Sequence, residues 1–399
     1  MTAARGAPLL DGLVVLDFTR VLAGPYCTAM LGDAGARVVK VESLQGDDQR
    51  RMGVVIGDES ASFAMINRNK QSVRIDLGRP EGQRLARQLA ARADVVVENF
   101  KPGVARKLGI DFEALAAENP RLVYCSISGF GQDGPNAAKP AYDVVAQALS
   151  GLMSITGEPE GPPTLVGESL GDICAGMFAA WGIMAALFAR ERTGRGRYLD
   201  VAMFDSLFAV QPTALTQYLY AGVVPRRVGN RHPLSSPFGV YAAEDGHFVL
   251  AAANDKLFAA VTHAIGRPDL LADERFRTDQ RRCQHDQALR EYIEGWSRSR
   301  NLATVLAAFD SAGVPAAPIL GVDDAARSDQ ASARGLLAPT RHAKHGERWV
   351  VPQPVKFAGT APNLARAAPE LGADTDAVLG ELLGLDSAAR AALRARGVI

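Results

Sequence analysis

The sequence predicts an α/β protein whose large domain is a doubly wound parallel sheet, followed by a smaller α+β domain. Three observations support this. Short β-branched segments alternate with helical ones over residues 1–130, the expected strands are apolar throughout, and the composition changes near residue 226. Alternating strands and helices are typical of a parallel sheet with helices on both faces. Strands covered on both faces are continuously apolar.

Five strands are expected in the first part of the chain. They are 13–18 (LVVLDF), 37–42 (RVVKVE), 72–76 (SVRID), 94–100 (DVVVENF) and 122–128 (LVYCSIS). Helical segments such as GPYCTAMLGDAG and PEGQRLARQLAARA separate them. This order indicates a Rossmann-like sheet, in which ligands bind beyond the carboxyl ends of the strands. That rule selects five loops: Thr19–Gly24, Ser43–Asp47, Leu77–Arg79, Lys101–Gly103 and Gly129–Gly134.

The rest of the chain predicts a long helix, a small domain and a return segment. Residues 173–190 are apolar nearly all round and are expected to form a buried helix, followed by a strand at YLDVAMF. The large domain is expected to begin with residues 1–225. Residues 226–328 are expected to form the small domain, with a strand pair around YAAEDGHFVLAA and helices such as DQALREYIEGW and ATVLAAFDSAG. Residues 329–399 are expected to complete the large domain through VVPQPVKFAG and a last amphipathic helix.

Bulk composition excludes several classes of protein. Lys+Arg and Asp+Glu both number 44, so no net charge favours nucleic acid or an anionic membrane. The four cysteines contain no CxxC pair, which argues against a disulfide framework or a zinc site. The first residues lack a secretory apolar region, and no uninterrupted apolar stretch of membrane-spanning length is evident. We expect a cytoplasmic protein without a metal.

The loop Gly129–Gly134 matches GxGxxG but lacks the context of a dinucleotide site. In that fingerprint the last glycine opens a helix whose amino end faces pyrophosphate. Here Pro135 and Asn136 follow, and the motif comes after the fifth expected strand rather than the first. We expect a flexible loop and no NAD site.

A second motif, Gly167-Glu168-Ser169-Leu170-Gly171, matches the GxSxG of serine hydrolases, and Asp172 follows it directly. A nucleophile elbow needs a strand before the serine, whereas GEPEGPPTLV precedes it. A catalytic triad also needs a histidine, and none of the six stands in a recognisable context. Asp172 lies at the start of the long helix, where an aspartate serves as an N-cap worth about 1 kcal/mol. The same position would hold an ionised carboxylate toward a cleft, as a nucleophile requires.

Taken together, these segments resemble the family III CoA-transferases. The resemblance covers essentially the whole chain and includes PLLDGLVVLDFTRVLAGPYCTAMLGDAGARVVKVE, NRNKQSVRIDL, VVENFKPG, YCSISGFGQDGP, AYDVVAQALSGLMSITGEPEGPP, GDICAG, ALFARERTGRGRYLDVAMFDSL and APELGADTDAVLGELLG. It implies that Asp172 is the nucleophile and Ser169 a loop residue. It also implies an interlocked ring homodimer, and coenzyme A as substrate rather than as a tightly bound cofactor.

The resemblance implies a set of coenzyme A contacts. They are Leu22, Ala23, Ile75, Asp76, Leu77, Gly78, Asn99, Phe100, Lys101 and Lys107, with Tyr142 beside the thioester. Several fall in the loops that the sheet rule selects. The formyl-specific member has an arginine where this chain has Ser43, and Arg79 is a candidate substitute. Ile75 and Leu77 could equally be core residues, and Lys101 and Lys107 solvated charges.

The implied reaction transfers coenzyme A from an acyl-CoA to a carboxylic acid through aspartyl anhydride and aspartyl-CoA thioester intermediates. Three alternatives remain. An α-methylacyl-CoA racemase of the same superfamily needs a histidine where this chain has Tyr142, whose phenol has a reference pKa of about 10. A GxSxG hydrolase or thioesterase would use Ser169. A non-enzymatic protein would bind coenzyme A without exchange.

The choice of substrate follows from one segment. GNRHPLSSPFGVYA (229–242) stands where the formyl-specific member has consecutive glycines, which argues against oxalate and formyl-CoA. The segment is more similar to members that act on dicarboxylic acids. Arg226, Arg227 and Arg231 lie near enough in sequence to meet a second carboxylate. We therefore expect succinyl-CoA as donor and a dicarboxylate as acceptor.

Overall fold

The computed structural model describes residues 8–399, which divide into two compact units. The first unit runs to Leu152 and also contains Leu165–Leu215 and Gln330–Ile399. The second contains Met153–Thr164 and Thr216–Asp329. Each unit has its own hydrophobic core, and each is described separately.

The first unit is built on a six-stranded sheet in the order β5-β2-β1-β6-β7-β8, with every neighbouring pair parallel. Its strands are β1 (Val14–Asp17), β2 (Arg37–Glu42), β5 (Lys70–Arg74), β6 (Val95–Glu98), β7 (Val123–Ser128) and β8 (Tyr198–Ala202). The six strands that the sequence predicts here are confirmed to within two residues at their ends. The order reverses between β1 and β6, where the chain connections leave in opposite directions.

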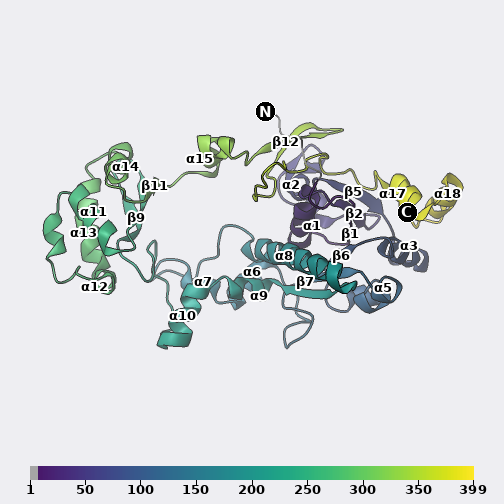
Figure 1. The fold of residues 1–399 in the computed structure, drawn as a ribbon, viewed down its shortest axis with the longest axis horizontal. Helices are drawn as coiled ribbons and strands as arrows, with labels where there is room; N and C mark the ends of the chain where they lie inside the picture. Colours follow the sequence, from purple (N-terminus) through teal and green to yellow (C-terminus); the bar gives the residue numbers. More distant parts are fainter. Residues whose placement is uncertain (1–7) are drawn as a thin grey trace. The chain divides into compact units, whose positions relative to one another are not determined.

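Alternate residues of these strands enter two separate cores, because successive side chains point to opposite faces. Val15, Val95 and Val123 pack with α1 (Ala23–Asp33) and α8 (Leu170–Thr193) on one face. Leu16 and Val96 pack with α3 (Pro80–Ala90), α5 (Phe112–Glu118) and the C-terminal helices on the other. Figure 1 shows α1 and α8 running together along one side of the sheet. This arrangement explains why the strands are continuously apolar.

The helices of the first unit connect and cover these strands. They are α1 (Ala23–Asp33), η1 (Asp48–Arg51), α2 (Ala61–Ile66), α3 (Pro80–Ala90), α4 (Val104–Lys107), α5 (Phe112–Glu118), α6 (Asp143–Leu149), α8 (Leu170–Thr193) and α9 (Met203–Ala209). A two-stranded hairpin, β3 (Val55–Ile56) with β4 (Glu59–Ser60), precedes α2. In three helices, part of the helix belongs to each unit: α7 (Leu152–Ile155), α10 (Pro212–Ala221) and α16 (Asp329–Ala333).

Helix α8 begins three residues earlier than expected, which corrects the position of Asp172. Ser169 occupies the N-cap position and Asp172 is the third helical residue, so Asp172 is not the N-cap. Gly194 ends the helix in the left-handed conformation, with φ of 68°. With a mean hydropathy of 1.7, α8 is long and apolar enough to cross a membrane, contrary to the expectation from sequence. Its buried face packs in the core against α1, which accounts for part of that composition.

The return segment joins the first unit, but its strands lie earlier than expected. A hairpin forms from β12 (Ala338–His342) and β13 (Gly346–Val350), whereas most of VVPQPVKFAG is irregular because prolines interrupt it. Two helices follow rather than one, α17 (Thr375–Leu383) and α18 (Ser387–Ala395). The chain end then reaches the sheet, where the Asp76 N–H donates to the Val398 carbonyl over 2.8 Å.

The second unit contains a three-stranded antiparallel sheet in the order β11-β10-β9. Its elements are β9 (Phe238–Ala242), β10 (His247–Ala251), α11 (Asp255–Ala264), η2 (Pro268–Leu271), α12 (Asp279–Gln284), α13 (Asp286–Ser297), α14 (Leu302–Ser311), β11 (Ala316–Pro318) and α15 (Val322–Arg327). Two segments differ from the predicted division, because residues 216–225 also belong to this unit rather than to the large domain. Residues 153–164 group with this unit, since the Gly229 N–H bonds the Gly157 carbonyl over 3.1 Å.

Candidate active site

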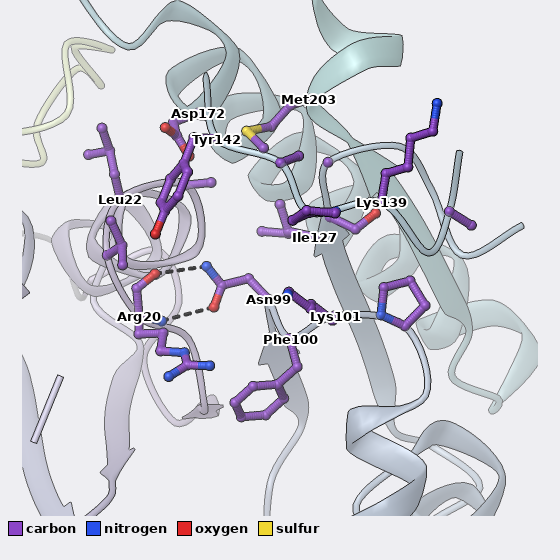
Figure 2. Close-up of a pocket in the computed structure, with 18 of the residues that line it drawn as sticks. Arg20, Leu22, Asn99, Phe100, Lys101, Ile127, Lys139, Tyr142, Asp172 and Met203 are labelled. Atoms are coloured by element: carbon purple, nitrogen blue, oxygen red, sulfur yellow. Dashed lines mark hydrogen bonds between the residues drawn. The ribbon is translucent and has the colours of Figure 1, made fainter. Parts of the chain in front are cut away.

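A pocket of about 320 Å³ lies at the carboxyl ends of β1, β6 and β7, where the strand order reverses (Figure 2). Doubly wound sheets bind ligands at this point because connections leaving in opposite directions open a crevice there. Its lining comes from the β1–α1 connector, the loop after β6, the loop before α6 and the start of α8. It comprises Arg20, Val21, Leu22, Ala23, Asp48, Asn99, Phe100, Lys101, Pro102, Ile127, Ser128, Gly129, Ala137, Lys139, Pro140, Ala141, Tyr142, Asp172 and Met203.

Asp172 reaches this pocket from the first turn of α8 and is partly buried. The Ala23 N–H faces this carboxylate and favours its ionised form. Burial and the neighbouring Asp143 raise the pKa of Asp172 to about 6, and the Ala23 N–H opposes that rise. The amino end of α8 favours the ionised form, because its unpaired N–H groups carry partial positive charge. Asp172 is thus a desolvated carboxylate that ionises just below neutrality.

Asp143 caps α8 from the neighbouring helix, a task that the Ser169 side chain does not perform. The Asp143 Oδ1 accepts the Gly171 N–H over 2.6 Å, and its Oδ2 accepts the Gln147 side-chain amide over 2.7 Å. Gln147 is fully buried and also accepts the Val166 N–H over 2.9 Å. Asp143 and Gln147 therefore hold the loop before α8 and its first turn in place.

Glycines let α8 and α1 approach closely beside Asp172. A Cβ on Gly176 would lie 2.7 Å from the Ala23 carbonyl oxygen and 3.1 Å from Tyr26 Cδ1. A Cβ on Gly24 would overlap the Thr19 side chain. The short distance between the two helices brings the Ala23 N–H to the carboxylate.

The Asn99 side chain joins the ends of β1 and β6. Its Oδ1 accepts the Arg20 N–H over 2.9 Å, and its Nδ2 donates to the Arg20 carbonyl over 2.8 Å (Figure 2). Both polar atoms of the amide are thus engaged by the backbone. Asn99 shapes the pocket, and these bonds leave one Nδ2 hydrogen with which the side chain could still donate to a ligand.

A buried ion network supports the ends of β1 and β2 beneath the pocket. Asp17 Oδ2 lies 3.0 Å from Lys70 Nζ, and both side chains are inaccessible to solvent. Burial alone would raise the pKa of Asp17, but Lys70, Lys40 and two threonine hydroxyls outweigh it and lower the pKa to about 2. Burial lowers the pKa of Lys70 to about 8. Such a fully paired network fixes the backbone from which the pocket loops leave.

Three cations line the same pocket. Arg20 is exposed, lies 3.6 Å from Asp48 and stacks over the Phe100 ring at 5.7 Å. Lys101 and Lys139 are also exposed, and neither makes a side-chain ion pair with any described residue. A site with cations free to pair is suited to an anionic ligand. Sequence reasoning missed Arg20 and Lys139 as site residues, although Arg20 lies in a loop that the sheet rule selects.

A smaller pocket of about 210 Å³ lies beside the first and shares Arg20 and Phe100 with it. Ile75, Asp76, Leu77 and Gly78 line it, together with Ser43 and Asp47 at the end of β2. Eleven of the twelve predicted site residues therefore line one of these two adjoining pockets, although they come from separate loops. One of the eleven, Ile75, is fully buried. An elongated ligand could extend across both.

Three residues considered from the sequence are poorly placed to bind a ligand. Ile75 lines the smaller pocket but is fully buried in the core. Lys107 is exposed at the end of α4 and lines neither pocket. Arg79 pairs with Asp76 over 3.2 Å and also lies outside both linings, so a phosphate contact from Arg79 has no support.

The arginines considered for a second carboxylate belong to the second unit. Arg227 donates to the backbone carbonyls of Glu158 and Gly161 over 3.1 and 2.8 Å, so its guanidinium is largely occupied. Arg231 lines a separate cavity of about 540 Å³ within that unit. Arg226 is exposed.

The GxGxxG and GxSxG motifs both have the local structures that the sequence predicts. Residues 129–142 form an irregular loop after β7, without a helix that would open at Gly134. Residues 161–169 contain no strand, so Ser169 does not lie on a nucleophile elbow. Ser169 is also not among the residues that line the described pocket, which contains no histidine.

One cluster outside the pocket has the composition of a metal site. Ligand atoms of Glu59, His342 and His345 lie within 4.8 Å of one another. However, Nδ1 of His342 accepts the N–H groups of Lys344 and His345, which leaves its proton on Nε2. Arg348 also pairs with Glu59 over 3.0 Å. The cluster is satisfied as a network of ion pairs and hydrogen bonds, which does not favour metal binding.

If Asp172 is the nucleophile, we expect the reaction rate at saturating substrate to rise with pH through about 6. The reason is that the ionised form of a carboxylate is the nucleophilic one and the pKa of Asp172 is about 6. Asp143→Asn removes the neighbouring negative charge while an amide oxygen can still cap Gly171. The pKa of Asp172 should then fall, and the acidic side of the pH–rate profile (its acid limb) should move to lower pH. A pH–rate profile of both proteins measures this, and an unmoved acid limb would contradict it.

The fold and the pocket are those of a ligand-binding α/β protein, and comparison with known proteins establishes its class and family. The chain belongs to CoA-transferase family III, whose family model matches residues 10–375. It is 44% identical over 361 residues to the acetyl-CoA:oxalate CoA-transferase of Acetobacter aceti, covering 90% of this chain and 91% of the relative. It is 39% identical over 386 residues to the succinate–glutarate CoA-transferase of Agrobacterium fabrum, covering 94% and 96%.

Solved structures agree with this assignment. A CAIB/BAIF family protein from Brucella suis has a TM-score of 0.83 and 38% identity, covering 94% of this chain and 99% of that one. A hypothetical protein from Mycobacterium tuberculosis has a TM-score of 0.83 and 28% identity, covering 93% and 99%. The prediction of a family III CoA-transferase is confirmed, and the non-enzymatic alternative is excluded.

Proposed function

We propose that Asp172 is the nucleophile that carries the acyl group and then coenzyme A between two carboxylic acids. The observation that carries this proposal is its position. A partly buried carboxylate with an N–H donor and a pKa of about 6 lies in the pocket at the point where the strand order reverses.

The proposed reaction proceeds in balanced exchanges. The Asp172 carboxylate attacks the acyl-CoA carbonyl, and the C–S bond breaks to give a mixed anhydride and CoA thiolate. The thiolate attacks the aspartyl carbonyl, and the donor acid leaves as carboxylate. The acceptor carboxylate then attacks the aspartyl-CoA thioester, and the released thiolate attacks the acyl carbonyl of the new anhydride. This forms the product thioester and frees Asp172. No tightly bound cofactor is needed, since one thioester replaces another.

The Ala23 N–H supports these steps. It faces the carboxylate and favours its ionised form in the resting protein. When the aspartyl carbonyl is attacked, its oxygen gains negative charge, and a donor already in place stabilises that charge without reorganisation. The cations Arg20, Lys101 and Lys139 are available for the phosphates of coenzyme A or for the acid substrate. The walls must exclude water, because anhydride and thioester both hydrolyse.

The racemase and hydrolase alternatives are less well supported by the same site. A racemase of this superfamily would need a histidine to move the α-proton, and Tyr142 lies in that place, with its side chain 70% exposed. The hydrolase would need Ser169 on an elbow and a histidine beside it. Neither is present among the residues that line the described pocket.

For the acceptor we propose a short dicarboxylate, with succinyl-CoA or acetyl-CoA as donor. Relatives named for oxalate, glutarate and mesaconate support this class. The expectation against oxalate has no support, because the relative that is 44% identical is named for oxalate. A panel of mono- and dicarboxylic acids, incubated with each acyl-CoA and followed by mass spectrometry, tests the proposal. We expect transfer to dicarboxylates above acetate, and no transfer to any dicarboxylate would contradict it.

We also propose that the protein works as a homodimer through the exposed face of α8. Met177, Phe178, Trp181, Met184 and Phe188 form an apolar stripe on this helix, and Trp181 and Phe188 are 71% and 66% exposed. Stripes of this kind mark protein interfaces. Sedimentation velocity at low micromolar concentration should show a dimer that Trp181→Glu weakens. A stable monomer of the unmodified chain would refute the proposal.

A further inference from the structure

Val21, in the connector between β1 and α1, adopts a strained backbone conformation. Its φ is 65°, in the left-handed region. That region is a genuine outlier for a β-branched residue and persists only where the surroundings impose it. Val21 lines the main pocket and lies two residues before Ala23, which lines the same pocket and whose N–H faces the carboxylate of Asp172. The shape of this connector therefore determines where that donor points.

Asp47, at the end of the β2 loop, holds Val21 in this conformation. The Val21 N–H donates to Asp47 Oδ1 over 3.0 Å, and the Asp47 side chain is almost inaccessible to solvent. Asp47 Oδ2 lies 2.8 Å from Lys40 Nζ, which in turn donates to the Thr19 carbonyl over 2.7 Å. One buried ion pair thus binds the connector at two points.

The remaining backbone groups of the connector are bound as well. Thr19 N–H donates to Asp17 Oδ1 over 2.8 Å, and Asn99 binds both polar groups of Arg20. Side chains from the ends of β1, β2 and β6 therefore hold consecutive peptide groups. Of these side chains, Asp47 is the one that binds Val21, the residue in the strained conformation.

We propose that Asp47 is a positioning residue for the transfer reaction. By keeping Val21 in the left-handed conformation, it directs the Ala23 N–H at the carboxylate of Asp172. The donor then lies ready for the charge that develops on the aspartyl carbonyl oxygen. Asp47 acts through Val21 and needs no contact with substrate. The inference rests on the proposed role of Asp172 as the nucleophile.

Two variants separate this role from a general effect on folding. Asp47→Ala should lower kcat by about 10²-fold, because a misplacement of about 1 Å costs that much. Its acid limb should move to higher pH, since the Ala23 N–H lowers the pKa of Asp172. Adding Val21→Gly should restore at least tenfold of kcat, because glycine adopts a positive φ without the Cβ penalty. Asp47 also caps η1 through the Gln49 N–H, a contact that Val21→Gly cannot restore.

Asp33→Ala is the matched control. Asp33 is a buried carboxylate at the far end of α1 that likewise accepts a backbone N–H, from Gln353 over 2.8 Å, and pairs with Arg68. It should lose as much thermal stability as Asp47→Ala yet keep kcat and the acid limb. Equal kinetic losses in both variants, or no recovery with Val21→Gly, would overturn the inference. If Asp172→Asn is inactive while Asp47→Ala keeps the kcat and pH–rate profile of the unmodified protein, only this inference fails. An active Asp172→Asn would remove the proposed nucleophile itself.

Discussion

Asp172→Ala and Asp172→Asn are expected to lower CoA transfer by at least about 10⁴-fold, because no other group in the pocket is placed to replace a covalent nucleophile. Binding of coenzyme A should persist, since the other lining residues come from separate loops. Isothermal titration of coenzyme A and a transfer assay measure the two properties. The alanine variant excludes slow deamidation of asparagine as a source of residual activity.

Ser169→Ala is the control for this prediction. Ser169 is the N-cap residue by position, but its side chain makes no capping bond, so its removal should leave most activity and stability. An inactive Ser169→Ala with an active Asp172→Asn would return the hydrolase interpretation. Loss of coenzyme A binding in Asp172→Ala would instead indicate that the carboxylate maintains the pocket.

Asn99→Leu is expected to lower kcat/KM by about 10²-fold while the chain stays folded. The substitution keeps the branching and heavy-atom count of the side chain but removes both partners of the Arg20 backbone, which are 2.9 and 2.8 Å away. The connector should then shift, and displacements of about 1 Å in a site cost about 10²-fold in rate. Steady-state kinetics and thermal unfolding of the same preparation measure both effects.

Asn119→Leu provides a matched comparison at the opposite edge of the sheet. Asn119 makes the same kind of clamp, with its Nδ2 donating to the Ala93 carbonyl over 2.9 Å and its Oδ1 accepting the Arg121 N–H over 3.2 Å. It should reduce stability without changing kcat/KM. If the two variants had the same kinetics, the Asn99 clamp would have no special part in catalysis.

The sheet could be predicted from sequence because its strands are buried on both faces and stay apolar across their length. The strand register and the reversal between β1 and β6 were not visible, since they depend on which strands pair. Their loops were predictable all the same, because parallel strands end at one edge. Regions with weaker local signals were misplaced. Prolines in VVPQPVKFAG interrupt pairing, and the hairpin forms earlier, at β12 and β13.

The candidate site was predictable where chemistry is local and hidden where it depends on tertiary contacts. Asp172 was found from its place at a helix start and from the family resemblance. Its partners were not found, because Asp143 caps α8 from 28 positions earlier in the chain and the Ala23 N–H comes from another helix. The sequence did not indicate a role for Asp47, because that role depends on the backbone conformation of Val21.

Trapping the covalent intermediate tests the central claim most directly. Hydroxylamine added during turnover should convert an aspartyl anhydride or thioester to a hydroxamate, which peptide mass spectrometry can locate. The account predicts one modified residue, Asp172, with the modification dependent on acyl-CoA and absent from Asp172→Asn. A hydroxamate on another residue, or its absence during active turnover, would contradict it.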